Sequence, residues 1–124
     1  MAGLNGGLLY NSWPDMNGSF IPDDTIKTDL YNLESLNNAS VIQFYHRLVA
    51  YILILFLIIL NYFFYKNKIE LKPIIFFNFA ILFQVILGIV TLITGVKIYY
   101  ASLHQLGSVF VLSSFLFIYY KNTN

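Results

Sequence analysis

The chain has no cysteine among its 124 residues and few charged residues. Without cysteine, disulfides, thiolate zinc sites and cysteine-ligated iron–sulfur clusters are excluded within the chain. Only 10% of the residues are charged and the formal net charge is +1, so the sequence provides no basic surface for a nucleic-acid partner. Only two residues are histidine, His46 and His104. Metal-ligand chemistry is therefore assigned to this pair by elimination.

Hydrophobic residues, by contrast, are abundant. They make up 58% of the chain, and the mean hydropathy is +0.68, which predicts a membrane protein surrounded by lipid. Three apolar runs cover about 41–65, 73–94 and 98–120, and each has the roughly 20 residues that a hydrocarbon layer of ~30 Å requires. The connection at 95–97 is so short that the second and third spans must form an antiparallel hairpin. The predicted fold is an all-α membrane protein with three transmembrane helices.

The charges that are present predict the orientation of these spans. Lysines gather at 66–72 between the first two spans, whereas five of the six acidic residues lie within 15–34. The positive-inside rule then places the 66–72 linker and the C-terminus inside, and residues 1–40 outside. We therefore divide the chain into an outer loop, 1–40, and a three-span domain, 41–124. Within the loop, a turn-rich stretch precedes a predicted short amphipathic helix with apolar residues Ile26, Leu30 and Leu33.

The two histidines lie at matching depths. His46 is about the sixth residue of the first span and His104 about the seventh of the third, so both are expected roughly 8 to 10 Å below the outer edge. The two spans run in the same direction, which allows the imidazoles to face each other. A depth-matched pair is the geometry of bis-imidazole haem ligation in helical bundles.

Small residues accompany the histidines. Ala50 follows His46 by one turn, Gly107 and Ser108 follow His104, and Gln84, Gly88, Thr91 and Gly95 form one stripe of the second span. Such a stripe leaves room for a porphyrin face, or it is an ordinary close-packing surface between helices. Both interpretations stay open from spacing alone.

Two neighbouring polar residues have interpretations of their own. Arg47 can extend to lipid phosphates or can pair with a haem propionate, and Lys97 in the outer hairpin loop has the same two interpretations. Gln105 points elsewhere on its helix and is interpreted as a polar packing residue.

Four ordered motifs carry a family resemblance. AGLNGGLLYNSWPDMNGSFIP, IQFYHRLVAY, FQVILGIVTL and LHQLGSVFVL follow one another as they do in the C-terminal half of haem A synthase, over essentially the whole chain. These enzymes are similar to two fused four-helix halves, and this chain would correspond to the end of helix five, the outer loop and helices six to eight. The resemblance implies a haem b held between His46 and His104, with Arg47 beside it.

The resemblance also implies a reaction. The other half of such enzymes binds haem O and oxidises its C8 methyl to a formyl group, which yields haem A for cytochrome oxidase in the bacterial or mitochondrial inner membrane. We therefore expect this chain to be a fragment or a split-gene product whose partner is the missing N-terminal half. In the catalytic half, the position matching Gln43 is a glutamate, so we expect no catalytic residue here and no conversion of haem O by this chain alone.

Two other classes remain as alternatives. Haem b-binding membrane anchors of the succinate dehydrogenase type also have three spans, and one of them resembles the His46-Arg47 pair. Their other motifs are not visible here, and the YNSWPDMNG loop has no role in such an anchor. The third class is a cofactor-free accessory membrane protein, which an absorption spectrum would distinguish.

Overall fold

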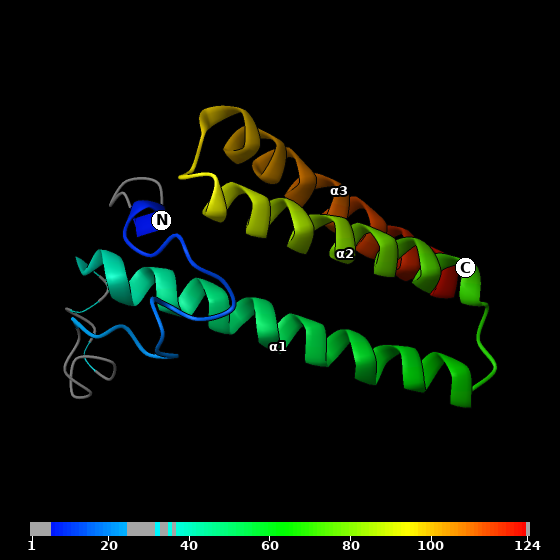
Figure 1. Ribbon diagram of the computed structural model, residues 1–124. Coiled ribbons are helices and arrows are strands. Elements are labelled where there is room, and N and C mark those ends of the chain that lie inside the picture. Colours follow the sequence, from blue (N-terminus) through cyan, green and yellow to red (C-terminus); the bar gives the residue numbers. More distant parts are fainter. Residues whose placement is uncertain (1–5, 25–31, 33–34, 36, 124) are drawn as a thin grey trace.

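Three long helices form the membrane part of the protein. The computed structural model describes residues 6–24, 32, 35 and 37–123, which form a 3-10 turn η2 (Gly6–Leu8) and helices α1 (Ala39–Lys66), α2 (Leu71–Ile93) and α3 (Ile98–Thr123) (Figure 1). All three α-helices are long and apolar enough to cross a membrane. This confirms the predicted all-α membrane fold. Each predicted span ends within three residues of an observed helix end.

The turn between α2 and α3 makes the predicted antiparallel hairpin. After α2, the Gly95 N–H donates to the Leu92 carbonyl at 3.1 Å and the Val96 N–H donates to the Thr91 carbonyl at 2.8 Å. This pair of bonds is the Schellman ending of a helix, which needs a left-handed residue, and Gly95 provides it with φ 71°. Gly95 therefore belongs to the turn rather than to the small-residue stripe of the second span.

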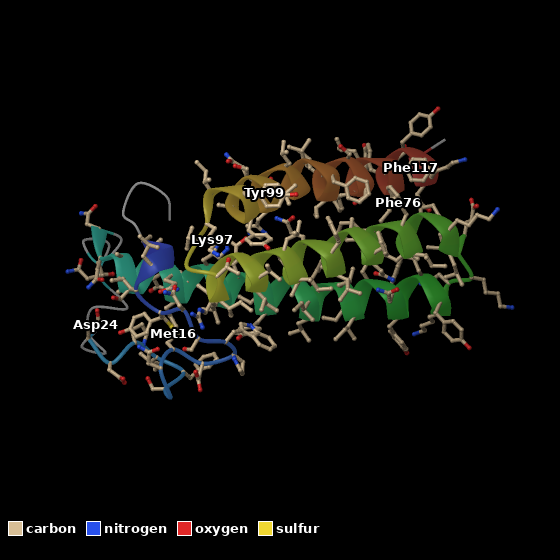
Figure 2. All side chains as sticks on the ribbon, turned by 45° about the horizontal axis from the view of Figure 1, so that its top comes forward. Met16, Asp24, Phe76, Lys97, Tyr99 and Phe117 are labelled. Atoms are coloured by element: carbon tan, nitrogen blue, oxygen red, sulfur yellow. The ribbon has the colours of Figure 1, made fainter. Side chains whose placement is uncertain are left out.

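Helices α2 and α3 lie side by side, and α1 runs along α2 (Figure 1). The end of the bundle at the 66–72 linker is packed by a cluster of apolar side chains: Phe64, Ile74, Phe77, Ile81 and Ile118. Phe76 of α2 also meets Phe117 of α3 edge to face at 6.4 Å (Figure 2).

One polar contact joins α1 to α2. The side-chain amides of Asn61 and Asn78 exchange two hydrogen bonds of 2.9 and 2.7 Å. Each amide satisfies the other in surroundings where an unpaired polar group would be costly, so the pair fixes how α1 and α2 align.

The outer loop packs against the first half of α1. Met16 and Ser19 pair across a tight turn in which Asn17 and Gly18 have φ of 58° and 97°, a conformation that the Asn-Gly sequence favours. Tyr10 and Met16 are buried against Phe44 of α1 in what we call the outer cluster. The residues of the predicted amphipathic helix, Ile26, Leu30 and Leu33, lie outside the described part of the chain.

Candidate functional site

The structure brings His46 and His104 together. His46 lies two turns into α1 and His104 two turns into α3, near the end of the bundle at which the outer loop lies. Their ring centroids are 6.3 Å apart and the ring planes cross at 83°. The two imidazoles, 58 positions apart in the chain, thus meet across the space between α1 and the α2–α3 hairpin.

This separation suits a single metal between the rings. A metal bonded to an imidazole nitrogen at about 2 Å lies about 3 Å from the ring centre, so two axial imidazoles place their centres about 6 Å apart. The measured 6.3 Å agrees with that value. The described residues contain no cluster of three or more His, Cys, Asp or Glu side chains. The donor set is therefore two neutral nitrogens, which suits a metal whose other ligands come from a macrocycle.

Helix α2 fixes the position of His104. A Cβ atom placed on Gly88 would lie only 3.0 Å from Cε1 of His104, so the imidazole rests directly against the glycine backbone. One turn away, the Gln84 side chain donates from Nε2 to the His104 carbonyl at 2.8 Å. A Cβ atom on Gly107 would lie 2.2 Å from Oε1 of Gln84, so only glycine leaves room for that amide. The small-residue stripe therefore makes close contact between α2 and α3, as the packing interpretation requires.

His46 lies on a helix that is tied to the outer loop instead. One turn before it, Gln43 is fully buried; its Oε1 accepts from the Tyr10 N–H at 3.2 Å and its Nε2 donates to the Tyr10 carbonyl at 2.7 Å. Arg47 donates to the carbonyls of Tyr10 at 3.0 Å and Asp15 at 2.7 Å. The partner of the Gln43 side chain is thus the backbone of the outer loop.

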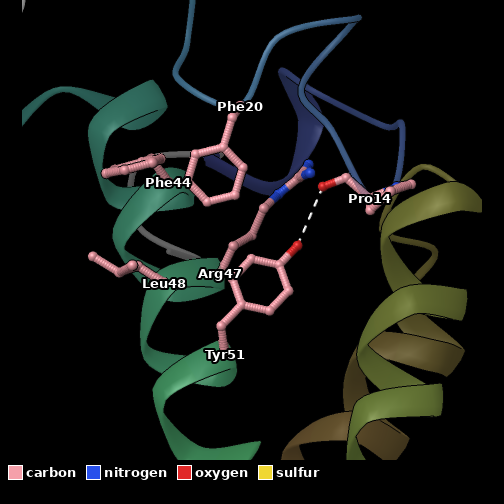
Figure 3. A pocket seen from close by; sticks show the side chains of 6 residues that line it. All are labelled: Pro14, Phe20, Phe44, Arg47, Leu48 and Tyr51. Atoms are coloured by element: carbon pink, nitrogen blue, oxygen red, sulfur yellow. Dashed lines mark hydrogen bonds between the residues drawn. The ribbon is translucent and has the colours of Figure 1, made fainter. Parts of the chain in front are cut away.

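The contacts of Arg47 are therefore made within the protein. Figure 3 shows its side chain among loop and helix residues, where the Tyr51 hydroxyl donates to the Pro14 carbonyl at 3.2 Å and Phe20 lies above. The space left among them is about 10 Å³, no more than a water molecule occupies. The guanidinium has five N–H donors and these two bonds use two of them, while its buried Nε has no partner.

A carboxylate secures the start of α1. Asp24 accepts hydrogen bonds from the hydroxyls of Tyr10, at 2.7 Å, and Ser40. Partial burial acts to raise the pKa of Asp24, but the bonds from Ser40 and Tyr10 outweigh it and lower that pKa below its ordinary value. Burial and the same bond to Asp24 raise the pKa of the Tyr10 hydroxyl.

An apolar cavity lies between the three helices, and neither histidine is among the residues that line it. Its volume is about 280 Å³, and side chains from all three helices line it, among them Leu53, Phe56, Phe77, Ile81, Ser108 and Phe115. The outer side of the pair carries Arg47 and the polar loop.

The sequence analysis missed the roles of two residues in the candidate site, Tyr10 and Gln84. Tyr10 joins Gln43, Arg47 and Asp24, but nothing in its apolar sequence surroundings singles it out. The contact of Gln84 with His104 could have been inferred from its place on the stripe, four residues before Gly88. Gln105, interpreted as a packing residue, is exposed.

Comparison with known proteins now gives the family. Residues 1–116 match the model of the cytochrome oxidase assembly protein family. The chain belongs to this family. It is 58% identical over all 124 residues to the "Heme A synthase" of Pelagibacter ubique, of which it covers 37%. It is also 39% identical over 122 residues to that of Rickettsia felis, a match that covers 97% of this chain and 36% of the relative. It is 33% identical over 117 residues to that of Wolbachia pipientis, and this match covers 94% of this chain and 32% of the relative.

These relatives confirm the haem A synthase resemblance and are bacterial enzymes. With its three apolar spans, the chain is a multi-pass protein of the bacterial inner membrane. It spans only about a third of the length of the relatives it matches. No solved structure matches the chain. The family match favours the haem A synthase resemblance over the succinate dehydrogenase-type alternative.

Proposed function

We propose that this chain is the haem b-binding part of a haem A synthase, in which His46 and His104 would hold the haem iron. The observation that carries the proposal is the 6.3 Å separation of the ring centroids, which leaves room for one iron held by both imidazoles. The bound haem would supply one-electron transfer. His46 and His104 would hold it, and the apolar cavity lined by Leu53 and Ile81 would be available to its apolar edge.

Arg47 completes the proposed site on the outer side. Its backbone partners in the loop hold the guanidinium beside His46, with donors remaining for a propionate. Since a propionate is anionic and the inner cavity is apolar, the propionates would face the loop and Arg47. Lys97, in the turn between α2 and α3, is exposed, and we do not include it in the proposed haem site.

The reaction itself is assigned to another part of the enzyme. Oxidation of the haem O C8 methyl to a formyl group needs a group that can exchange protons, and no Asp or Glu lies within the three helices. Both the oxygen and the nitrogen of the Gln43 side-chain amide already form hydrogen bonds with the Tyr10 backbone. We propose that the part of such an enzyme that this chain does not span supplies the haem O site, and that this chain supports electron transfer.

The test is a spectrum of the purified protein. The reduced protein should show the sharp bands of a low-spin haem b, and His46→Ala or His104→Ala should each abolish them because one axial ligand is lost. Gln105→Ala, next to His104 but exposed, is the control and should keep the bands. An unchanged spectrum in both histidine variants would remove the proposal. Supplied with haem O, reductant and dioxygen as oxidant, this chain alone should produce no haem A, and a formyl product would place the active site here.

A further inference from the structure

Two buried polar side-chain atoms near His104 make no hydrogen bond in the structure, although the main-chain carbonyl of Gln84 also faces the imidazole. The two atoms are Nδ1 of His104 and Oε1 of Gln84. The imidazole lies against Gly88, and Gln84 is one turn away on the same face of α2, bonded through its Nε2 to the backbone of His104. A potential donor and an acceptor are thus left unpaired at the same contact between α2 and α3, where leaving either group unpaired costs free energy.

The chemistry of an axial histidine explains why both atoms are present. A neutral imidazole that binds iron through Nε2 carries its proton on Nδ1, and metal-bound histidines almost always donate that proton to an acceptor. Gln84 presents such an acceptor, and the absence of a side chain at Gly107 is what allows the amide to reach α3. The side-chain amide of Gln84 therefore lies beside His104, and its Oε1 has no hydrogen-bond donor in the structure.

We infer that Gln84 is the positioning residue of His104: its Oε1 accepts the Nδ1 proton, directly or through one bridging water, while its Nε2 holds the His104 backbone. The inference rests on the proposed haem ligation. A hydrogen bond from Nδ1 increases the electron density of the ligand and favours ferric iron, so it lowers the midpoint potential of the haem. Gln84 would then adjust the potential without touching the haem.

The experiment is a redox titration of the low-spin haem in the full protein. Gln84→Met keeps the length of the side chain but removes both hydrogen-bonding groups, so the midpoint potential should rise. Gln84→Glu keeps an acceptor and adds negative charge, so the potential should fall below that of the unsubstituted protein. Gln105→Met is the matched control, because it removes an exposed amide adjacent to His104 and should leave the potential unchanged.

The outcomes separate this inference from the proposed function. Equal potentials in Gln84→Met and Gln105→Met would overturn the role of Gln84 while leaving haem ligation in place. If Gln84→Met fails to retain haem, Gln84→Glu decides, and a potential at or above that of the unsubstituted protein overturns the inference. Absence of low-spin haem from the unsubstituted protein would instead reject the ligation itself.

Discussion

Replacing Gln43 with leucine should release the outer loop from α1. Gln43 is fully buried and its amide makes two hydrogen bonds with the backbone of Tyr10. Leucine removes both bonds and leaves the Tyr10 N–H without a partner, whereas the Tyr10 carbonyl keeps its bond from Arg47. The substitution therefore acts on one identifiable backbone amide.

The expected magnitude follows from these contacts. A net hydrogen bond contributes about 1 kcal/mol, and a buried unpaired N–H costs roughly 1 to 3 kcal/mol, so attachment of the loop should weaken by at least about 2 kcal/mol. Since about 1.4 kcal/mol corresponds to a tenfold change in an equilibrium constant, the open population of the loop should rise roughly thirtyfold. Haem is not involved in this estimate, so the prediction is independent of the proposed ligation.

Hydrogen–deuterium exchange in detergent measures this opening. Peptides that contain Tyr10 should exchange faster in Gln43→Leu by about the factor given above, because exchange from a rapidly reclosing segment follows its open population. Gln105→Leu is the control, since it also replaces a helical glutamine but at an exposed position on α3 rather than on α1. If the two variants exchange equally at Tyr10, the proposed attachment through Gln43 is refuted.

Three further predictions concern other parts of the fold. Reporter fusions within 66–72 should be found on the inner side and fusions within 11–20 on the outer side, and the reverse result would contradict the orientation taken from the lysines. Folding lowers the pKa of Asp24. The carboxylate therefore stabilises the folded loop fully at pH values above its ordinary pKa of 3.8, and this stabilisation is lost as the pH falls through the lowered pKa. Exchange of the loop should therefore accelerate in acid, and Asp24→Asn should flatten that dependence; equal pH profiles would show that another group is responsible. Asn78→Leu breaks the paired amides with Asn61 and should lower the stability of the helical bundle by about 1 kcal/mol in a detergent unfolding titration. Asn67→Leu, whose amide bonds only to Phe63 of its own helix, should have a smaller effect, and equal losses would argue against the interhelical pair.

The helices were predictable because the bilayer imposes a length that the sequence must meet. The spans at 41–65, 73–94 and 98–120 reproduce the observed helices closely, and the short connection at 95–97 required the hairpin. The matched depth of His46 and His104 follows from the same arithmetic of rise per residue. Helix length and histidine depth both depend on distance along the helix axis, which can be counted in residues from the sequence.

The partners of polar side chains were not predictable in the same way. Gln43 and Arg47 both bond to Tyr10, more than thirty residues earlier in the chain, through backbone atoms that every residue possesses. Periodicity identifies the face on which a side chain lies, but it cannot tell which loop backbone comes to meet it. For the same reason, Arg47 was expected at phosphate or propionate groups and the structure adds loop carbonyls to its contacts.

The location of the loop contacts has a consequence for how the protein is assembled during synthesis. Tyr10 and Asp15 bond to residues 43–47, which leave the ribosome well before the α2–α3 hairpin exists. The loop can therefore fold onto α1 as an early unit that already carries His46. The hairpin then arrives with His104 already held by Gln84 and Gly88 on its own partner helix. Each half of the histidine pair is thus prepared by separate, local contacts, and the last step of assembly is the meeting of two units that are already folded.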